Sequence, residues 1–243
     1  ALLTTAECFR LFVIAGDEAL KAKLGFAESD AGIVVTPDIA AYRMRKVSLL
    51  NGAHTVSVAA ALLSGCETVL QAMQHPAVGA FVHRVLLDEI LPMVDAPDAD
   101  AFARSVLERF ANPHVQHALI DITLHGTTKW RVRVIPTLVR AVERTGRVPE
   151  AIAFGFAAHL VLLRGELAAS RRAAGLHVPA DDLGDVIRTA WQGVDDRSSE
   201  SVQAFVKRVL ADASLWGVDL SVLPQFQQTV ATQVSRILSQ GAL

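Results

Sequence analysis

The sequence predicts a mostly α-helical protein with a small β element near its N-terminus. After residue 36, apolar residues recur at i, i+3 and i+4 along nearly the whole chain, which is the period of an amphipathic helix. Alternating strand–helix units are absent. The chain has 243 residues, of which 51% are hydrophobic, so it can bury a sizeable core. We therefore expect residues 1–243 to form a single helical domain.

The β element is expected before the helices begin. Residues 11–15 form a strand-like apolar segment, and residues 33–35 are a run of β-branched side chains. Residues 17–24, between them, have the pattern of a short helix. The sequence therefore predicts a strand, a helix and a second strand in this order.

One long helix is predicted over residues 37–64. Thr36 is a favourable N-cap, Pro37 suits the first helical position, and Asp38 faces the positive end of the helix dipole. No helix-ending signal follows until Gly65, which suits the position after a helix end.

Further helices are expected along the rest of the chain, each from its apolar periodicity. They are predicted at residues 67–74, 77–91, 99–110, 115–124, 129–144, 149–167, 182–193, 199–215 and 223–239. The segment 169–182 contains Gly, Pro and paired Asp residues, and these indicate a surface loop.

Composition excludes several classes of function. A net charge of −2 gives no electrostatic basis for binding nucleic acid or an anionic membrane surface. The longest uncharged run, 47–66, is interrupted by Asn51 and His54, so it is a poor membrane span. Two cysteines do not make a disulfide framework. With no signal-peptide pattern, we expect a cytoplasmic location, and the abrupt start on a strand suggests a preceding portion that this chain lacks.

Polar side chains interrupt the long helix at three positions. On a regular helix, each residue is rotated by about 100° around the axis from the one before it. With the angular position of Lys46 taken as 0°, His54 lies at about 80° and Asn51 at about 140°, so the three side chains point into one sector. A buried amide and imidazole cost free energy unless they are partnered. Two interpretations stay open: the groups satisfy one another in the core, or they form a site for carbonyl and alcohol chemistry, with the lysine as proton donor and acceptor.

A metal site is a weaker hypothesis. His114, His117 and Asp121 are spaced i, i+3 and i+7, so they would share one face of a helix and could bind zinc. Such spacing is common on solvated helix faces, and we expect no metal. The glycines form no GxG pair, no P-loop and no GxSxG turn, so no cofactor-binding fingerprint is present in the chain.

Lys46, Asn51 and His54 match the K-x4-N-x2-H pattern of the polyol-specific long-chain dehydrogenases, the mannitol dehydrogenase family. The segment RKVSLLNGAHT is most similar to the tagaturonate reductase (altronate oxidoreductase) branch of that family. Other segments follow in the order found in the family: Leu11–Ile14, Glu67–Val69, Asp88–Pro92, Arg109–Pro113, Thr128–Arg133 and Arg164–Glu166. The chain thus resembles the multi-helical C-terminal domain of these enzymes.

The resemblance implies a catalytic role for the three polar residues of the long helix. Lys46 would be the acid/base, while Asn51 and His54 would bind the reacting oxygen. The cofactor would be NAD, bound mainly by an N-terminal Rossmann-like domain that this chain lacks, so its binding residues here are unknown. That NAD-binding domain of the same protein would also be the chain's partner.

The substrate implied is a small sugar acid or polyol, with D-tagaturonate and D-altronate as the expected pair. Lys129 is the first candidate for the carboxylate, followed by Arg131 and His117. Asp121 stands where mannitol dehydrogenases carry an arginine, so their polyol contacts do not transfer. Alternatives are a fructuronate/mannonate or mannitol/fructose enzyme of the same family, or a non-catalytic helical interaction domain.

Overall fold

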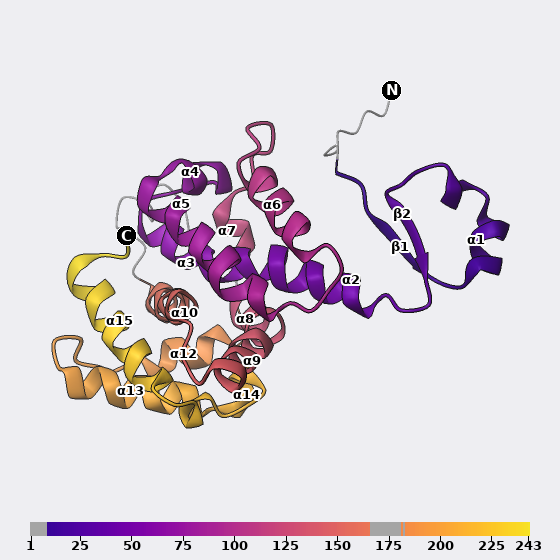
Figure 1. The fold of residues 1–243 in the computed structure, drawn as a ribbon. Coiled ribbons are helices and arrows are strands. Elements are labelled where there is room, and N and C mark those ends of the chain that lie inside the picture. Colours follow the sequence, from indigo (N-terminus) through magenta and orange to yellow (C-terminus); the bar gives the residue numbers. More distant parts are fainter. Residues whose placement is uncertain (1–8, 166–180, 182) are drawn as a thin grey trace.

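The computed structural model describes residues 9–165, 181 and 183–243. This part of the chain is mostly helical with one two-stranded sheet, which confirms the predicted fold class. The helices gather into one body, and the β segment stands apart from it, joined through the start of helix α2 (Figure 1).

The β segment is a strand–helix–strand unit, as predicted. Strands β1 (Phe12–Ala15) and β2 (Ile33–Thr36) pair in parallel, with Phe12 opposite Ile33. Helix α1 (Glu18–Leu24) and the 3₁₀ turn η1 (Phe26–Glu28) connect them. We call residues 9–36 the β lobe.

The predicted long helix is present and consists of three consecutive segments. They are α2 (Ala40–Arg45), the π-helical η2 (Lys46–Gly52) and α3 (Ala53–Leu63). By length and composition this helix could cross a membrane, yet 67% of its most apolar window is buried inside the protein, as in the core helix of a globular domain.

The long helix begins later than predicted. Thr36 is the last residue of β2, so it is not available as an N-cap. The helix starts at Ala40, whose N–H donates to Oδ1 of Asp38 at 2.7 Å. The other end is as predicted, since Gly65 has a φ of 98°, a left-handed conformation that favours glycine.

The helices of the remaining chain differ from the predictions mainly in their ends and interruptions. They are α4 (Val69–Gln74), α5 (Pro76–His83), the π-helical η3 (Arg84–Ile90), the 3₁₀ turn η4 (Leu91–Met93), α6 (Ala99–Phe110), α7 (Leu119–Ile122), α8 (Gly126–Arg133), α9 (Ile135–Thr145), α10 (Glu150–Leu163), α12 (Gly184–Ala190), α13 (Ser199–Ala211), α14 (Ala213–Trp216), the 3₁₀ turn η5 (Leu220–Val222) and α15 (Phe226–Gln240).

Two of these differences are corrections. The helix predicted over 129–144 is two helices, because Pro136 cannot continue a helix from the preceding turn and instead opens α9. The helix predicted over 115–124 shrinks to α7. The loop predicted over 169–182 lies outside the described residues apart from Asp181.

Helix α10 forms the centre of the core. Residues 151–163 are all buried, and the helix packs between α3 and α15 (Figure 1). The crossing with α3 is close, because a Cβ on Gly155 would lie 2.5 Å from the carbonyl oxygen of Val56. The carboxylate of Glu89 accepts the N–H groups of Ala151 and Ile152, both at 2.8 Å, and so caps the start of α10.

Candidate active site

A cavity of about 280 Å³ lies between the middle of the long helix and helices α6, α7 and α8. It combines an apolar wall with a set of charged and aromatic side chains. The lining residues are Leu50, Asn51, His54, Val69, Arg109, Phe110, Val115, His117, Asp121, Ile122, Lys129 and Arg133. Asn51 and His54 are therefore brought together, as the sequence predicted.

The π-helical segment determines how the K-x4-N pair is spaced. In a π-helix each N–H bonds to the carbonyl five residues earlier, so residues i and i+5 lie closer in angle around the axis than they do in an α-helix. Lys46 and Asn51 are separated by this interval and both belong to η2. The π-helical winding therefore brings them closer in angle than the 140° expected for a regular α-helix. Such π segments often occur at functional sites.

His54 lies between two other rings of the cavity. Its imidazole packs on Phe110, with ring centroids 3.9 Å apart, and meets the edge of His117 at 5.3 Å. Burial, aided by the positive charge of His117 and of Arg133, lowers the pKa of His54 to about 3. The ring is therefore neutral near pH 7, with one N–H to donate and one nitrogen to accept.

Two cations of helix α8 face the cavity one helical turn apart. The Nζ of Lys129 donates to the carbonyl oxygen of Ile122 at 2.9 Å. Burial and the charge of Arg133 lower the pKa of Lys129, and burial also lowers the pKa of Arg133. Arginine stays protonated in proteins, so the guanidinium still carries its charge.

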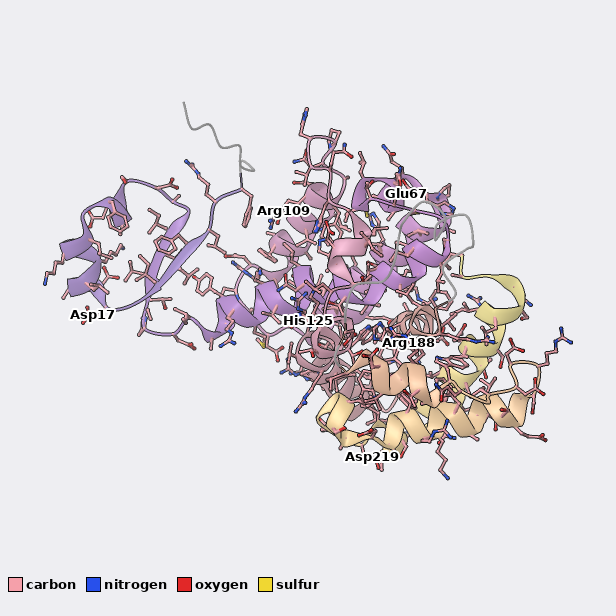
Figure 2. The ribbon with its side chains drawn as sticks, turned by 180° about the vertical axis from the view of Figure 1, so that it is seen from behind. Asp17, Glu67, Arg109, His125, Arg188 and Asp219 are labelled. Atoms are coloured by element: carbon pink, nitrogen blue, oxygen red, sulfur yellow. The ribbon has the colours of Figure 1, made fainter. Side chains whose placement is uncertain are left out.

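Arg109 and Arg133 were not among the residues predicted for the site. Arg133 could have been found, because it lies four residues after Lys129 and residues at that spacing share a helix face. Arg109 comes from α6, and no local pattern connects it with the long helix. Figure 2 labels Arg109 on the helical body and Asp17 on the β lobe, well apart from it. The guanidinium of Arg109 lies over the ring of Phe9, 4.6 Å from its centroid.

Lys46 differs from the prediction in its surroundings. Its side chain is exposed, and it does not line the cavity that contains Asn51 and His54. The described residues therefore do not bury the Lys46 side chain with Asn51 and His54. The physical reason is that the body packs against the long helix from other sides, and the described residues leave the Lys46 face open to solvent.

Of the predicted carboxylate ligands, His117 and Lys129 line the cavity but Arg131 does not. Arg131 is exposed, and its Nη1 donates to the carbonyl oxygen of Ser214 at 3.3 Å, at the far side of α8. Successive helix positions are rotated by about 100°, so Arg131 and Arg133 face different directions. The prediction for Arg131 is corrected accordingly.

The geometry behind the metal hypothesis is also different. His114 and His117 precede the short helix α7 that holds Asp121, so the three do not share a helix face. His117 and Asp121 line the cavity, and His114 does not. In the described part of the chain, no group of three or more His, Cys, Asp or Glu side chains could hold a metal ion.

Comparison with known proteins gives consistent relatives. The altronate oxidoreductase of Yersinia pestis is 38% identical over 245 residues, which cover 99% of this chain and 50% of that protein. The altronate oxidoreductase of Pectobacterium atrosepticum is 38% identical over 241 residues, covering 98% of this chain and 49% of that protein. The chain thus spans about half the length of the curated relatives it matches.

Solved structures share the fold. Mannitol 2-dehydrogenase of Pseudomonas fluorescens, in a ternary complex with NAD and D-mannitol, matches with a TM-score of 0.75 at 22% identity, over 89% of this chain and 42% of that one. A substrate-free D-sorbitol dehydrogenase matches with a TM-score of 0.67 at 23% identity, over 87% of this chain and 42% of that one. The sequence model of the mannitol dehydrogenase C-terminal domain matches residues 38–238. The chain therefore belongs to the mannitol dehydrogenase C-terminal domain family.

Proposed function

We propose that this chain supplies the substrate side of an NAD-dependent oxidoreductase that interconverts D-tagaturonate and D-altronate. The observation that carries the proposal is one cavity in which Asn51 and His54, of the K-x4-N-x2-H pattern, meet the cations Lys129 and Arg133. A keto-sugar acid has two groups that such a cavity can bind. Asn51 and His54 would polarise its carbonyl, and the cations Lys129 and Arg133 would neutralise its carboxylate. The naming of the relatives as altronate oxidoreductases supports this substrate pair.

The reaction needs a proton at the carbonyl oxygen when the carbon is reduced, and a base at the same place in the reverse direction. Lys46 is the proposed acid/base, in the same π-helical segment as Asn51. The amide of Asn51 and the neutral imidazole of His54 would hold the oxygen by hydrogen bonds and stabilise its developing charge. When bound, the nicotinamide supplies and accepts the hydride.

The β lobe supports a cofactor domain upstream. Parallel sheets are normally buried on both faces and contain more than two strands. In the part of the chain that the structure describes, the parallel pair has no further strand beside it, and Phe12 is exposed to 59% and Phe26 to 48%. We propose that a preceding Rossmann-like domain of the same protein extends this sheet and covers the exposed face at Lys46, and that the helical domain begins with the long helix. The proposed setting is the cytoplasm.

The β1–α1 turn does not fit the phosphates of NAD. Within the described part, the β1–α1 turn has Gly16 as its only glycine and lacks the glycine-rich pattern that lets a backbone approach a pyrophosphate. We therefore assign the binding of the cofactor phosphates to the upstream domain. The chain alone should not bind NADH at micromolar concentration, and calorimetric titration of residues 1–243 would reveal such binding if it occurs.

The substrate assignment is tested with the full-length protein by following NADH oxidation with D-tagaturonate, D-fructuronate and D-fructose. We expect kcat/KM to be at least about tenfold higher for D-tagaturonate, which corresponds to about 1.4 kcal/mol of transition-state discrimination. A preference for D-fructuronate or D-fructose would assign the protein to those branches of the family. Turnover of none of the three would support a non-catalytic domain instead.

A further inference from the structure

Arg133 is a charged side chain at the wall of the cavity, and no partner for it is found among the described residues. Its guanidinium is half-buried, and burial lowers its pKa. Among residues 9–165, 181 and 183–243, no ion pair and no side-chain hydrogen bond involves it, in contrast to Arg140 and Arg144 further along, which bond to Met93 and Asp95. A half-buried cation without an acceptor is costly, because water that is lost has not been replaced.

The other charged groups of the cavity do not neutralise Arg133. Lys129, one turn earlier, has the same charge and already donates to the carbonyl oxygen of Ile122. Asp121 is the one acidic residue among those that line the cavity, it is exposed, and none of the ion pairs of the described chain includes it. On α8, Lys129 and Arg133 thus bring two positive charges to a cavity wall whose described lining has this one carboxylate. The cavity is thus built for an anion.

Arg133 also separates this cavity from a second hollow. A groove of about 480 Å³ between α2 and α9 is lined by Asn51 and Arg133 among others, so these two residues border both spaces. The guanidinium therefore stands at the same boundary as the amide proposed to hold the reacting oxygen.

We propose that Arg133 is the residue that binds the carboxylate of the substrate and selects a sugar acid over a neutral sugar, with Lys129 as a second positive charge beside it. This rests on the proposed function, because it names the group that recognises the acidic end of the same substrate. A guanidinium matches a carboxylate with two parallel hydrogen bonds, whereas a lysine offers a point charge. Arg133 thus takes first place ahead of Lys129, which the family resemblance implied as the first carboxylate ligand, with Arg131 and His117 after it.

The test measures binding without turnover. In the full-length protein saturated with NADH, the aldonate D-altronate and the neutral alditol D-altritol are titrated by calorimetry. They differ in one carboxylate, and neither can be reduced by NADH at the proposed site. The wild type should bind D-altronate at least about tenfold more tightly, and Arg133→Gln should reduce the affinity for D-altronate by about ten- to a hundredfold, the usual range for a hydrogen-bonded charge. The affinity for D-altritol should change less than about threefold.

Two further variants make the result specific. Arg133→Lys keeps the positive charge but cannot make the two parallel hydrogen bonds of a guanidinium. Its affinity for D-altronate should therefore lie between those of the wild type and Arg133→Gln. Arg131→Gln, two residues away on the outer side of α8, should leave both affinities unchanged. The affinity for NADH should be the same in all four proteins, because a phosphate of the cofactor is the other anion that Arg133 could bind.

Three outcomes overturn the assignment: a wild type without preference for D-altronate, an Arg133→Gln variant that keeps the preference, or a loss confined to NADH. These outcomes are separate from a failure of the proposed function. If the wild type does not turn over D-tagaturonate but shows an Arg133-dependent preference for D-altronate, the carboxylate site stands and the reaction assigned to it does not.

Discussion

A single carboxylate oxygen of Asp181 accepts two hydrogen bonds from Thr127, one from its backbone N–H at 2.7 Å and one from its hydroxyl at 2.8 Å. The other oxygen of Asp181 accepts the N–H of Gly184 at 3.1 Å. Thr127 lies in the first turn of α8, and Gly184 begins α12. The buried Asp181 side chain thus caps two helices at once, one of which carries Lys129 and Arg133.

Asp181→Ala should lower the free energy of unfolding by about 2–4 kcal/mol, because it removes charge-assisted bonds from buried donors at two helix starts. Asp181→Asn should cost less, since the amide oxygen can still accept from one side. Urea unfolding measures both. The matched control is Asp185→Ala, which removes an exposed carboxylate from α12, one of the two helices that Asp181 caps. It should lower the free energy of unfolding by less than about 1 kcal/mol. Equal losses at the two positions would contradict the capping role.

Lys46→Ala in the full-length protein should reduce kcat at least about a hundredfold, the lower range for loss of a general acid/base. NADH affinity should be unchanged, since the cofactor is assigned to another domain. Added primary amines should restore part of the rate if the missing group transfers a proton. The control is Lys207→Ala, an exposed residue of α13. Near-normal turnover with an unaltered pH profile of kcat/KM would remove Lys46 from the mechanism.

Gly155→Ala should destabilise the protein by about 1–3 kcal/mol, the usual cost of overpacking a core. The added Cβ would lie 2.5 Å from both the carbonyl oxygen and Cγ1 of Val56. Combining it with Val56→Ala should recover only part of the loss, because the carbonyl oxygen stays in place. Gly52→Ala is the contrast, because its Cβ would meet nothing closer than 3.5 Å and alanine favours helix. Thermal unfolding measures the effect. A lower Tm for Gly52→Ala than for Gly155→Ala would contradict this packing.

The buried His159 should make the protein less stable in mild acid. Burial lowers its pKa to about 4, against about 6.5 in the unfolded chain. Between these values the unfolded state takes up a proton that the native ring does not, so the unfolding free energy falls as pH drops from about 6.5 to 4. Each such group contributes a slope of up to about 1.4 kcal/mol per pH unit.

Urea unfolding of wild type and His159→Gln at a series of pH values checks this contribution. The variant should show a flatter pH dependence in that window, with the remaining slope due partly to His54, whose pKa is also lowered. His83→Gln, an exposed position, should behave like the wild type. Parallel curves for wild type and His159→Gln would show that His159 does not cause the acid sensitivity.

Local sequence patterns were sufficient to predict the helical class, the strand–helix–strand unit at the start and the long helix that carries Asn51 and His54. These features follow from local rules: the period of apolar residues, the glycine at a helix end and the β-branched runs act over a few neighbouring positions. The helix 99–110 was predicted with the bounds of α6 for this reason. The K-x4-N-x2-H pattern likewise needs only nine consecutive residues, so it could be recognised without a structure.

Long-range packing determines that Arg109 of α6 enters the cavity and that the centre of the long helix is π-helical. Helix rotation makes Arg131 and Arg133 face different directions, and the packing of α8 against η2 and α14 places Arg133 at the cavity and Arg131 at Ser214. The π segment and the entry of Arg109 from α6 depend equally on partners far away in sequence. Burial against distant segments outweighs the small local preferences of single residues, so these features could not be read from the chain's own periodicity.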